Sequence, residues 1–156
     1  MTMILLKNYF VNTTSSIDVI SVLHEVNRTL TESGVTEGLA TAVVPEPGGA
    51  LAIIEPLPDI VDRFKEMVSS FMGEGGQTVS RRKEEIDIGP RVAAAMLGKI
   101  LHVPVAEGRL VLGKREEPVL IDMEKGGRRR EFYVQVMGEG PAAGQPARPM
   151  PPPRRR

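Results

Sequence analysis

The chain has 156 residues, of which 41% are hydrophobic and 26% charged, and this favours one globular domain over a disordered chain. Its formal net charge is zero, but residues 1–140 carry 16 Lys and Arg against 20 Asp and Glu, whereas the last sixteen residues carry four arginines and no acid. No apolar run approaches the roughly 20 residues that cross a bilayer, and the absence of cysteine excludes disulfides and favours a cytoplasmic protein. A cysteine-free, arginine-rich chain is also compatible with a thermophile.

The N-terminal half of the sequence predicts strands and helices in mixed order. Apolar residues spaced i, i+1, i+4 and i+8 behind Ser21 indicate a helix, and a longer apolar stripe behind Pro58 indicates another. The elements expected here are a strand over 3–13 with 17–20 as its candidate continuation, a helix from Ser21 to Gly34, strands over 38–44 and 50–55, and a helix over 58–72.

The C-terminal half predicts mainly strands. Residues 73–85 are polar and are interpreted as a loop, and residues 91–97 form a short helix of small residues. Strands are expected over 100–105, 109–113, 118–124 and 129–137. This order lacks the regular alternation of a doubly wound sheet and favours an α+β fold of packed, largely antiparallel sheets with two to three helices. The domain is placed at residues 1–139, and residues 140–156 form a Pro- and Arg-rich tail that is predicted to be disordered.

The segment Pro45-Glu46-Pro47-Gly48-Gly49 joins the two central strands of the N-terminal half. A simple hairpin needs only a tight turn such as Asn-Gly. A longer loop with a fixed backbone, and with Glu46 as its one long side chain, indicates a place where something docks or once docked.

Other polar segments have simpler interpretations. His24 and His102 lack the spacing of metal ligands, so no metal site is expected. The cluster Arg81–Lys83 is followed by Glu84 and Glu85, which favours a self-neutralising loop over a nucleic-acid surface. Strand alternation places Arg128 and Arg130 on one face, where they would either grip a phosphate or carboxylate or form an edge-strand charge row.

Four stretches carry a resemblance to a known family: "IDVISVLHEVNRTLTESG", "SGVTEGLATAVVPEPGGALAIIE", "VAAAMLGKILHVPVAEGRLVLG" and "VLIDMEKGGRRREFYVQVMGE". Together they resemble the YjbQ-like family, also described as secondary thiamine-phosphate synthases. The resemblance implies an α+β fold, a homotrimer, and formation of thiamine phosphate from a pyrimidine pyrophosphate and a thiazole phosphate. It also implies a site centred on histidines with a nearby glutamate.

The site positions of the family are only partly matched. Glu55 matches the family's glutamate, and Arg128 and Arg130 match its arginine pair. Glu46 stands in place of the loop histidine, Arg91 in place of the helix histidine, and no histidine lies near Ser80.

The leading hypothesis is therefore a homotrimeric family member without cofactor or metal whose histidine site is lost. In it, Arg91 is expected to form a salt bridge with Glu46. Two alternatives stay open. One is an enzyme with a rewired site, in which Glu46 and Glu55 act as acid and base and Arg91, Arg128 and Arg130 hold a phosphorylated small molecule. The other is an interaction module whose basic, Pro-rich tail binds an acidic partner or nucleic acid.

Overall fold

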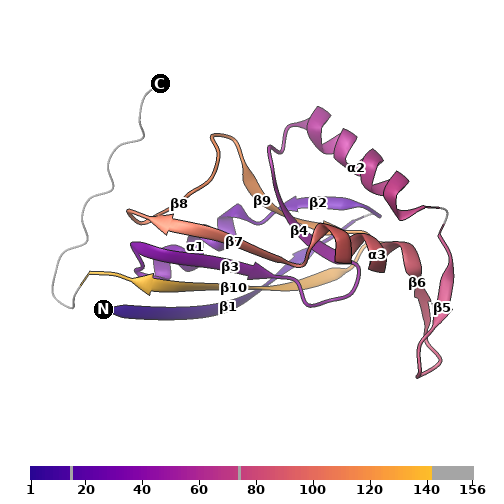
Figure 1. The fold of residues 1–156 in the computed structure, drawn as a ribbon, viewed down its shortest axis with the longest axis horizontal. Coiled ribbons are helices and arrows are strands. Elements are labelled where there is room, and N and C mark those ends of the chain that lie inside the picture. Colours follow the sequence, from indigo (N-terminus) through magenta and orange to yellow (C-terminus); the bar gives the residue numbers. More distant parts are fainter. Residues whose placement is uncertain (15, 74, 142–156) are drawn as a thin grey trace.

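The computed structural model describes residues 1–14, 16–73 and 75–141, which form antiparallel sheets with three helices (Figure 1). The largest sheet has the strand order β1 (Thr2–Asn12), β10 (Arg129–Glu139), β3 (Glu37–Val43), β7 (Ile100–Ala106) and β8 (Arg109–Leu110). The second sheet has the order β2 (Asp18–Ser21), β9 (Glu117–Asp122) and β4 (Gly49–Ile54). The predicted α+β class is confirmed.

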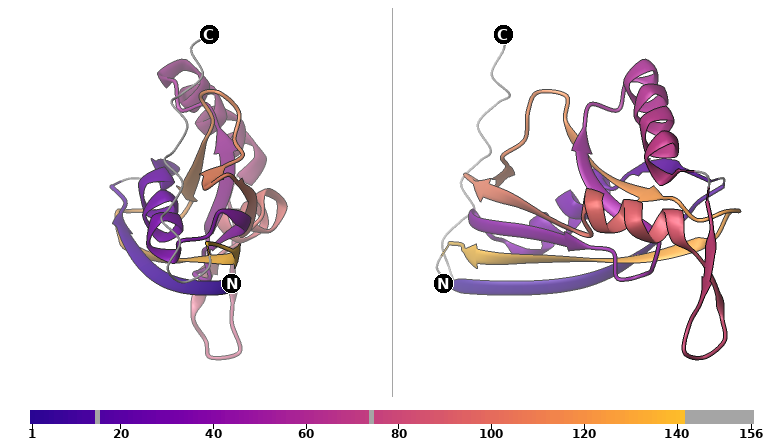
Figure 2. Two further views of the ribbon diagram at one scale, coloured as in Figure 1. Left: turned by 90° about the vertical axis from the view of Figure 1, so that its left-hand side faces the viewer. Right: turned by 45° about the vertical axis from the view of Figure 1, so that its right-hand side comes forward.

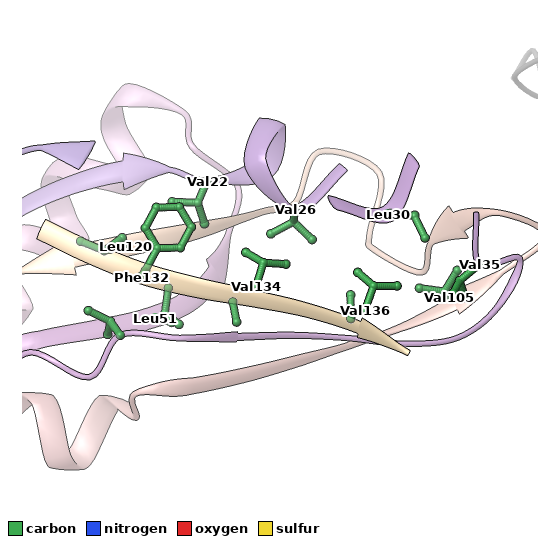
Figure 3. Close-up of a cluster of buried hydrophobic side chains, with 13 residues drawn as sticks. Val22, Val26, Leu30, Val35, Leu51, Val105, Leu120, Phe132, Val134 and Val136 are labelled. Atoms are coloured by element: carbon green, nitrogen blue, oxygen red, sulfur yellow. The ribbon is translucent and has the colours of Figure 1, made fainter. Parts of the chain in front are cut away.

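The main hydrophobic core lies between the inner face of the five-stranded sheet and helix α1 (Leu23–Ser33). Strand alternation turns every second residue of β10 inward, so Phe132, Val134 and Val136 are fully buried. Val26 and Leu30 of α1 pack against them (Figure 3). Gly34, in the left-handed conformation, ends the helix as the sequence predicts.

A second core lies where β4 and β9 meet the helices α2 (Pro58–Met72) and α3 (Ile88–Leu97). Strand β9 is buried along almost its whole length, which agrees with its continuous apolar sequence. Ala93 and Ala94 of α3 are buried in this core, because small side chains let the helix approach the sheet closely. The predicted bounds of α2 are confirmed, although Val68 alone among its residues is buried.

The structure corrects several details of the sequence prediction. Residues 17–20 do not continue the first strand, because β2 pairs with β9 in the second sheet. Residues 73–85 are not a plain loop: β5 (Gln77–Val79) and β6 (Glu85–Asp87) form a hairpin that projects from the body (Figure 2). The predicted tail falls almost wholly outside the described residues. No helix in the described ranges is long and apolar enough to cross a membrane.

Candidate functional site

The loop from Pro45 to Gly49 crosses from one sheet to the other, because β3 belongs to the five-stranded sheet and β4 to the second. Gly48 has a left-handed φ of 74°, and a Cβ atom placed on it would lie 2.4 Å from a carboxylate oxygen of Glu124. A Cβ on Gly49 would lie 2.9 Å from the Val44 side chain. The two glycines therefore leave room for the side chains of Glu124, which follows β9, and of Val44, which follows β3.

Both carboxylate oxygens of Glu46 accept hydrogen bonds from other residues of the protein. Oε2 accepts a hydrogen bond from Nη1 of Arg130 at 3.1 Å, and Oε1 accepts one from the backbone amide of Glu131 at 3.0 Å. The side chain is about one-third exposed. The lone carboxylate of the loop thus ties the loop to the start of β10.

Arg130 is the centre of a buried charge network. Its side chain is 1% exposed, and its Nη2 donates to Oδ1 of the fully buried Asp122 at 2.7 Å. Its Nη1 also donates to the carbonyl oxygen of Pro47 at 2.8 Å, while its buried Nε has no hydrogen-bond partner among the described residues. The guanidinium therefore joins the loop, β9 and β10 at one point. We call Arg130, Asp122 and Glu46, together with Glu124, Arg91 and Lys99 described below, the charge network.

Asp122 is held as a carboxylate by several donors. Thr13 Oγ1 donates to its Oδ2 at 2.7 Å, and the Glu124 amide donates to its Oδ1 at 3.1 Å. Burial alone raises the pKa of Asp122, but the hydrogen bonds from Arg130, Thr13 and the Glu124 amide outweigh it, so the pKa lies below its ordinary value. Burial likewise opposes the charge of Arg130, yet Asp122 and Glu46 place its pKa above the ordinary value.

Arg91 and Glu124 form the second ion pair of the network. Arg91 extends from α3, and its Nη1 donates to Oε1 of Glu124, which is 10% exposed and follows β9. The expected salt bridge between Arg91 and Glu46 is therefore wrong: the partner of Glu46 is Arg130 instead. The reason is that Arg130 reaches both Glu46 and Asp122, the last residue of β9, whereas Arg91 reaches Glu124, two residues after β9.

Lys99 adds a third cation to the network. Its Nζ donates to the carbonyl oxygens of Glu46 at 2.7 Å and Pro45 at 3.2 Å. The pKa of Lys99 is lowered, first by burial and then by the charges of Arg130 and Arg91, while Glu46 opposes this shift. Three cations and three carboxylates therefore balance around the loop, so the network is close to neutral.

The remaining predicted site residues lie apart from this network. Glu55 follows β4 at the end opposite to the loop and pairs with Arg115 at 3.2 Å. Arg128 precedes β10 and is exposed; its Nη2 donates to the carbonyl of Lys125 at 3.4 Å. Arg128 and Arg130 therefore differ in their surroundings, since Arg128 precedes β10 and only Arg130 is buried. Arg129, the next residue of β10, lies over the ring of Phe10.

Sequence reasoning missed Asp122, Glu124, Thr13 and Lys99. A signal for Asp122 was present, because an acidic residue ends the apolar run of a buried strand. Lys99 precedes Ile100, which pairs with Val43 just before the loop, so correct pairing of β3 with β7 would have placed it there. Within the described ranges, no group of three or more His, Asp or Glu side chains is arranged to hold a metal ion.

Fold and network define an α+β protein with two larger antiparallel sheets and a small hairpin sheet, with a polar site where the loop between the two larger sheets meets α3. The chain belongs to the family of YjbQ-like UPF0047 proteins, whose model matches residues 7–139. It is 28% identical over 141 residues to the UPF0047 protein YugU of Bacillus subtilis, covering 86% of this chain and all of that protein. It is 27% identical over 117 residues to the UPF0047 protein sll1880 of Synechocystis, covering 74% of this chain and 80% of that protein.

Solved structures show the same fold. A YbjQ-like protein of unknown function from Sulfolobus solfataricus superposes with a TM-score of 0.81 at 18% identity, covering 89% of this chain and all of the other. An uncharacterised protein of the YjbQ/UPF0047 family from Clostridium acetobutylicum superposes with a TM-score of 0.73 at 20% identity, covering 83% of this chain and 98% of the other. At these identities the likeness concerns the fold.

Proposed function

We propose that this protein is a non-catalytic member of the YjbQ-like family, in which an ancestral histidine site has become a structural charge network. The observation that carries the proposal is the double engagement of Glu46, which binds Arg130 and the Glu131 amide with its two oxygens. At the second position that differs from the family, Arg91 is paired with Glu124. A guanidinium stays protonated in proteins, so Arg91 cannot serve as a base or metal ligand.

A direct assay tests this proposal. The protein and a histidine-bearing family member are compared at equal concentration for formation of thiamine phosphate from the pyrimidine pyrophosphate and the thiazole phosphate. We expect product at the level of the protein-free control. Turnover comparable to that of the histidine-bearing protein would overturn the proposal and favour the rewired site acting on a phosphorylated small molecule.

We also propose that the protein is a homotrimer, located in the cytoplasm as its cysteine-free composition suggests. Support comes from the outer face of the five-stranded sheet, against which none of the described helices lies in the views of Figure 2. The register places exposed apolar residues of neighbouring strands on this face, namely Ile4, Leu6, Phe10, Ile100 and Met137. An exposed apolar face of this extent is typical of a protein–protein contact.

A further inference from the structure

The hairpin of residues 77–87, which we call the hairpin arm, is formed within itself and left uncovered by its own chain. All three residues of β5 are exposed, and Val79 is 61% exposed. Ser80 shapes the turn, because its Oγ accepts hydrogen bonds from the amides of Arg82 at 3.2 Å and Glu84 at 3.1 Å. An isolated two-stranded hairpin is at best marginally stable in water, so a surface that covers the exposed part of this arm would stabilise it.

The tip of the hairpin arm carries three consecutive cations. Arg81, Arg82 and Lys83 are all exposed, and none of them takes part in the ion pairs formed among the described residues. The arm points away from α2 in Figures 1 and 2. A surface that covers the arm should therefore combine apolar side chains for Val79 with carboxylates for the tip.

Such a surface exists on the N-terminal part of α2. An open groove of about 680 Å³, which we call the α2 groove, is lined by Ile54, Asp59, Ile60, Asp62, Arg63, Phe64, Glu66 and Met67. Ile60 and Met67 are 40% and 65% exposed, so apolar surface is available for contact. Three carboxylates against one arginine make the groove acidic, with Arg63 and Glu66 paired to each other at 3.3 Å.

We infer that the hairpin arm of one copy of this chain docks in the α2 groove of a second copy. The match is one of apolar surface and of charge. The three cations at the tip, which the exposed Glu84 and Glu85 follow in the same arm, meet the three carboxylates of the groove. The arm cannot dock in the α2 groove of its own chain. The arm begins beyond the C-terminal end of α2, about 20 Å along the helix from Asp59, and runs away from the helix.

The contact joins two different surfaces, so it is heterologous and closes only as a ring of copies. The inference thus rests on the self-association proposed above and adds a second contact to it. It also explains why the basic tip and the acidic groove occur on one nearly neutral chain.

Chemical cross-linking tests the contact directly, because the chain has no cysteine of its own. Two variants, Asp62→Cys and Arg82→Cys, are mixed and treated with a short bismaleimide. We expect a cross-linked dimer in the mixture that neither variant gives alone, and products up to the trimer from the double variant. A mixture without the heterologous dimer, under conditions in which light scattering shows an oligomer, would overturn the inference while leaving self-association intact.

Charge reversal provides the second test. Arg82→Glu and Asp62→Lys should each weaken association at least tenfold, because like charges then face each other, and the combined variant should recover most of the loss. Lys114→Glu, an equal charge change at an exposed residue outside both surfaces, is the control and should have no such effect. Equal association of Arg82→Glu and the parent would contradict the contact.

Discussion

Nη2 of Arg130 donates to Oδ1 of Asp122 at 2.7 Å, and the two side chains are 1% and 0% exposed. A buried pair of this kind is costly to form and more costly to break, since removal of one partner leaves an uncompensated charge. Arg130 also binds Glu46 and the Pro47 carbonyl, so the pair fixes the loop between the two sheets.

Asp122→Asn should lower the free energy of unfolding by about 3 kcal/mol, because Arg130 would keep its charge in a buried position without its main partner. Urea denaturation at neutral pH measures this. Arg115→Gln, which removes the largely exposed pair with Glu55, is the control and should stay within about 1 kcal/mol of the parent. A decrease in the free energy of unfolding no larger than that of the control would show that the buried pair does not stabilise the folded protein.

Stability should fall in acid because of Asp122. Its folded-state pKa lies below the ordinary value of 3.8, so the unfolded chain binds the proton more readily. The contribution of Asp122 is therefore fully present above pH 3.8 and is lost as the pH falls through the folded-state pKa. Urea midpoints between pH 7 and pH 2.5 measure this, and Asp122→Asn should show a shallower decline over the acid range. Parallel declines in the two proteins would contradict the assignment.

The partner of Glu46 can be measured by two double-mutant cycles. Glu46→Gln combined with Arg130→Gln should show a coupling energy above about 1 kcal/mol, because the two side chains are in contact. Glu46→Gln combined with Arg91→Gln should show a smaller coupling, since Arg91 binds Glu124. The opposite ranking would restore the pairing of Glu46 with Arg91 that the sequence suggested.

Gly48→Ala should destabilise the protein more than Gly34→Ala. The two glycines have nearly the same φ, 74° and 71°, so both substitutions incur the left-handed penalty of about 1–2 kcal/mol. A Cβ at Gly48 also meets the Glu124 side chain, whereas a Cβ at Gly34 meets only the Met3 side chain, at an ordinary contact distance of 3.6 Å. We expect an additional loss of at least about 1 kcal/mol for Gly48→Ala in urea denaturation. Equal losses would mean that Glu124 moves aside freely.

The homotrimer should not depend on the basic tail. Size exclusion with light scattering should give three times the chain mass of 17.0 kDa. A chain that ends at Gly140 should also be a trimer, because the removed residues include six prolines and few apolar side chains that could be buried. Its melting temperature should lie within about 5 °C of the parent, which corresponds to roughly 1 kcal/mol. A monomer at micromolar concentration would refute the assembly, and a larger shift would show that the tail is docked.

Local sequence patterns determined most of the secondary structure. The prolines and the apolar stripe of 58–72 set the bounds of α2, and alternation set the inner face of β10. The Pro-Glu-Pro-Gly-Gly segment also indicated a loop of special structure, because two adjacent glycines mark close backbone approach. Each of these features depends on neighbours within a few residues, so the sequence alone contains them.

Only the tertiary structure decided which charges meet. Glu46 and Arg130 lie 84 residues apart and were assigned to different partners by sequence reasoning. The separation of β1 from β2, and the pairing of β5 with β6 within a polar segment, were equally undetermined. The physical reason is that a guanidinium or a strand edge can form its hydrogen bonds with many different groups. The packing of the two larger sheets then determines which of these groups is buried beside it and becomes the partner.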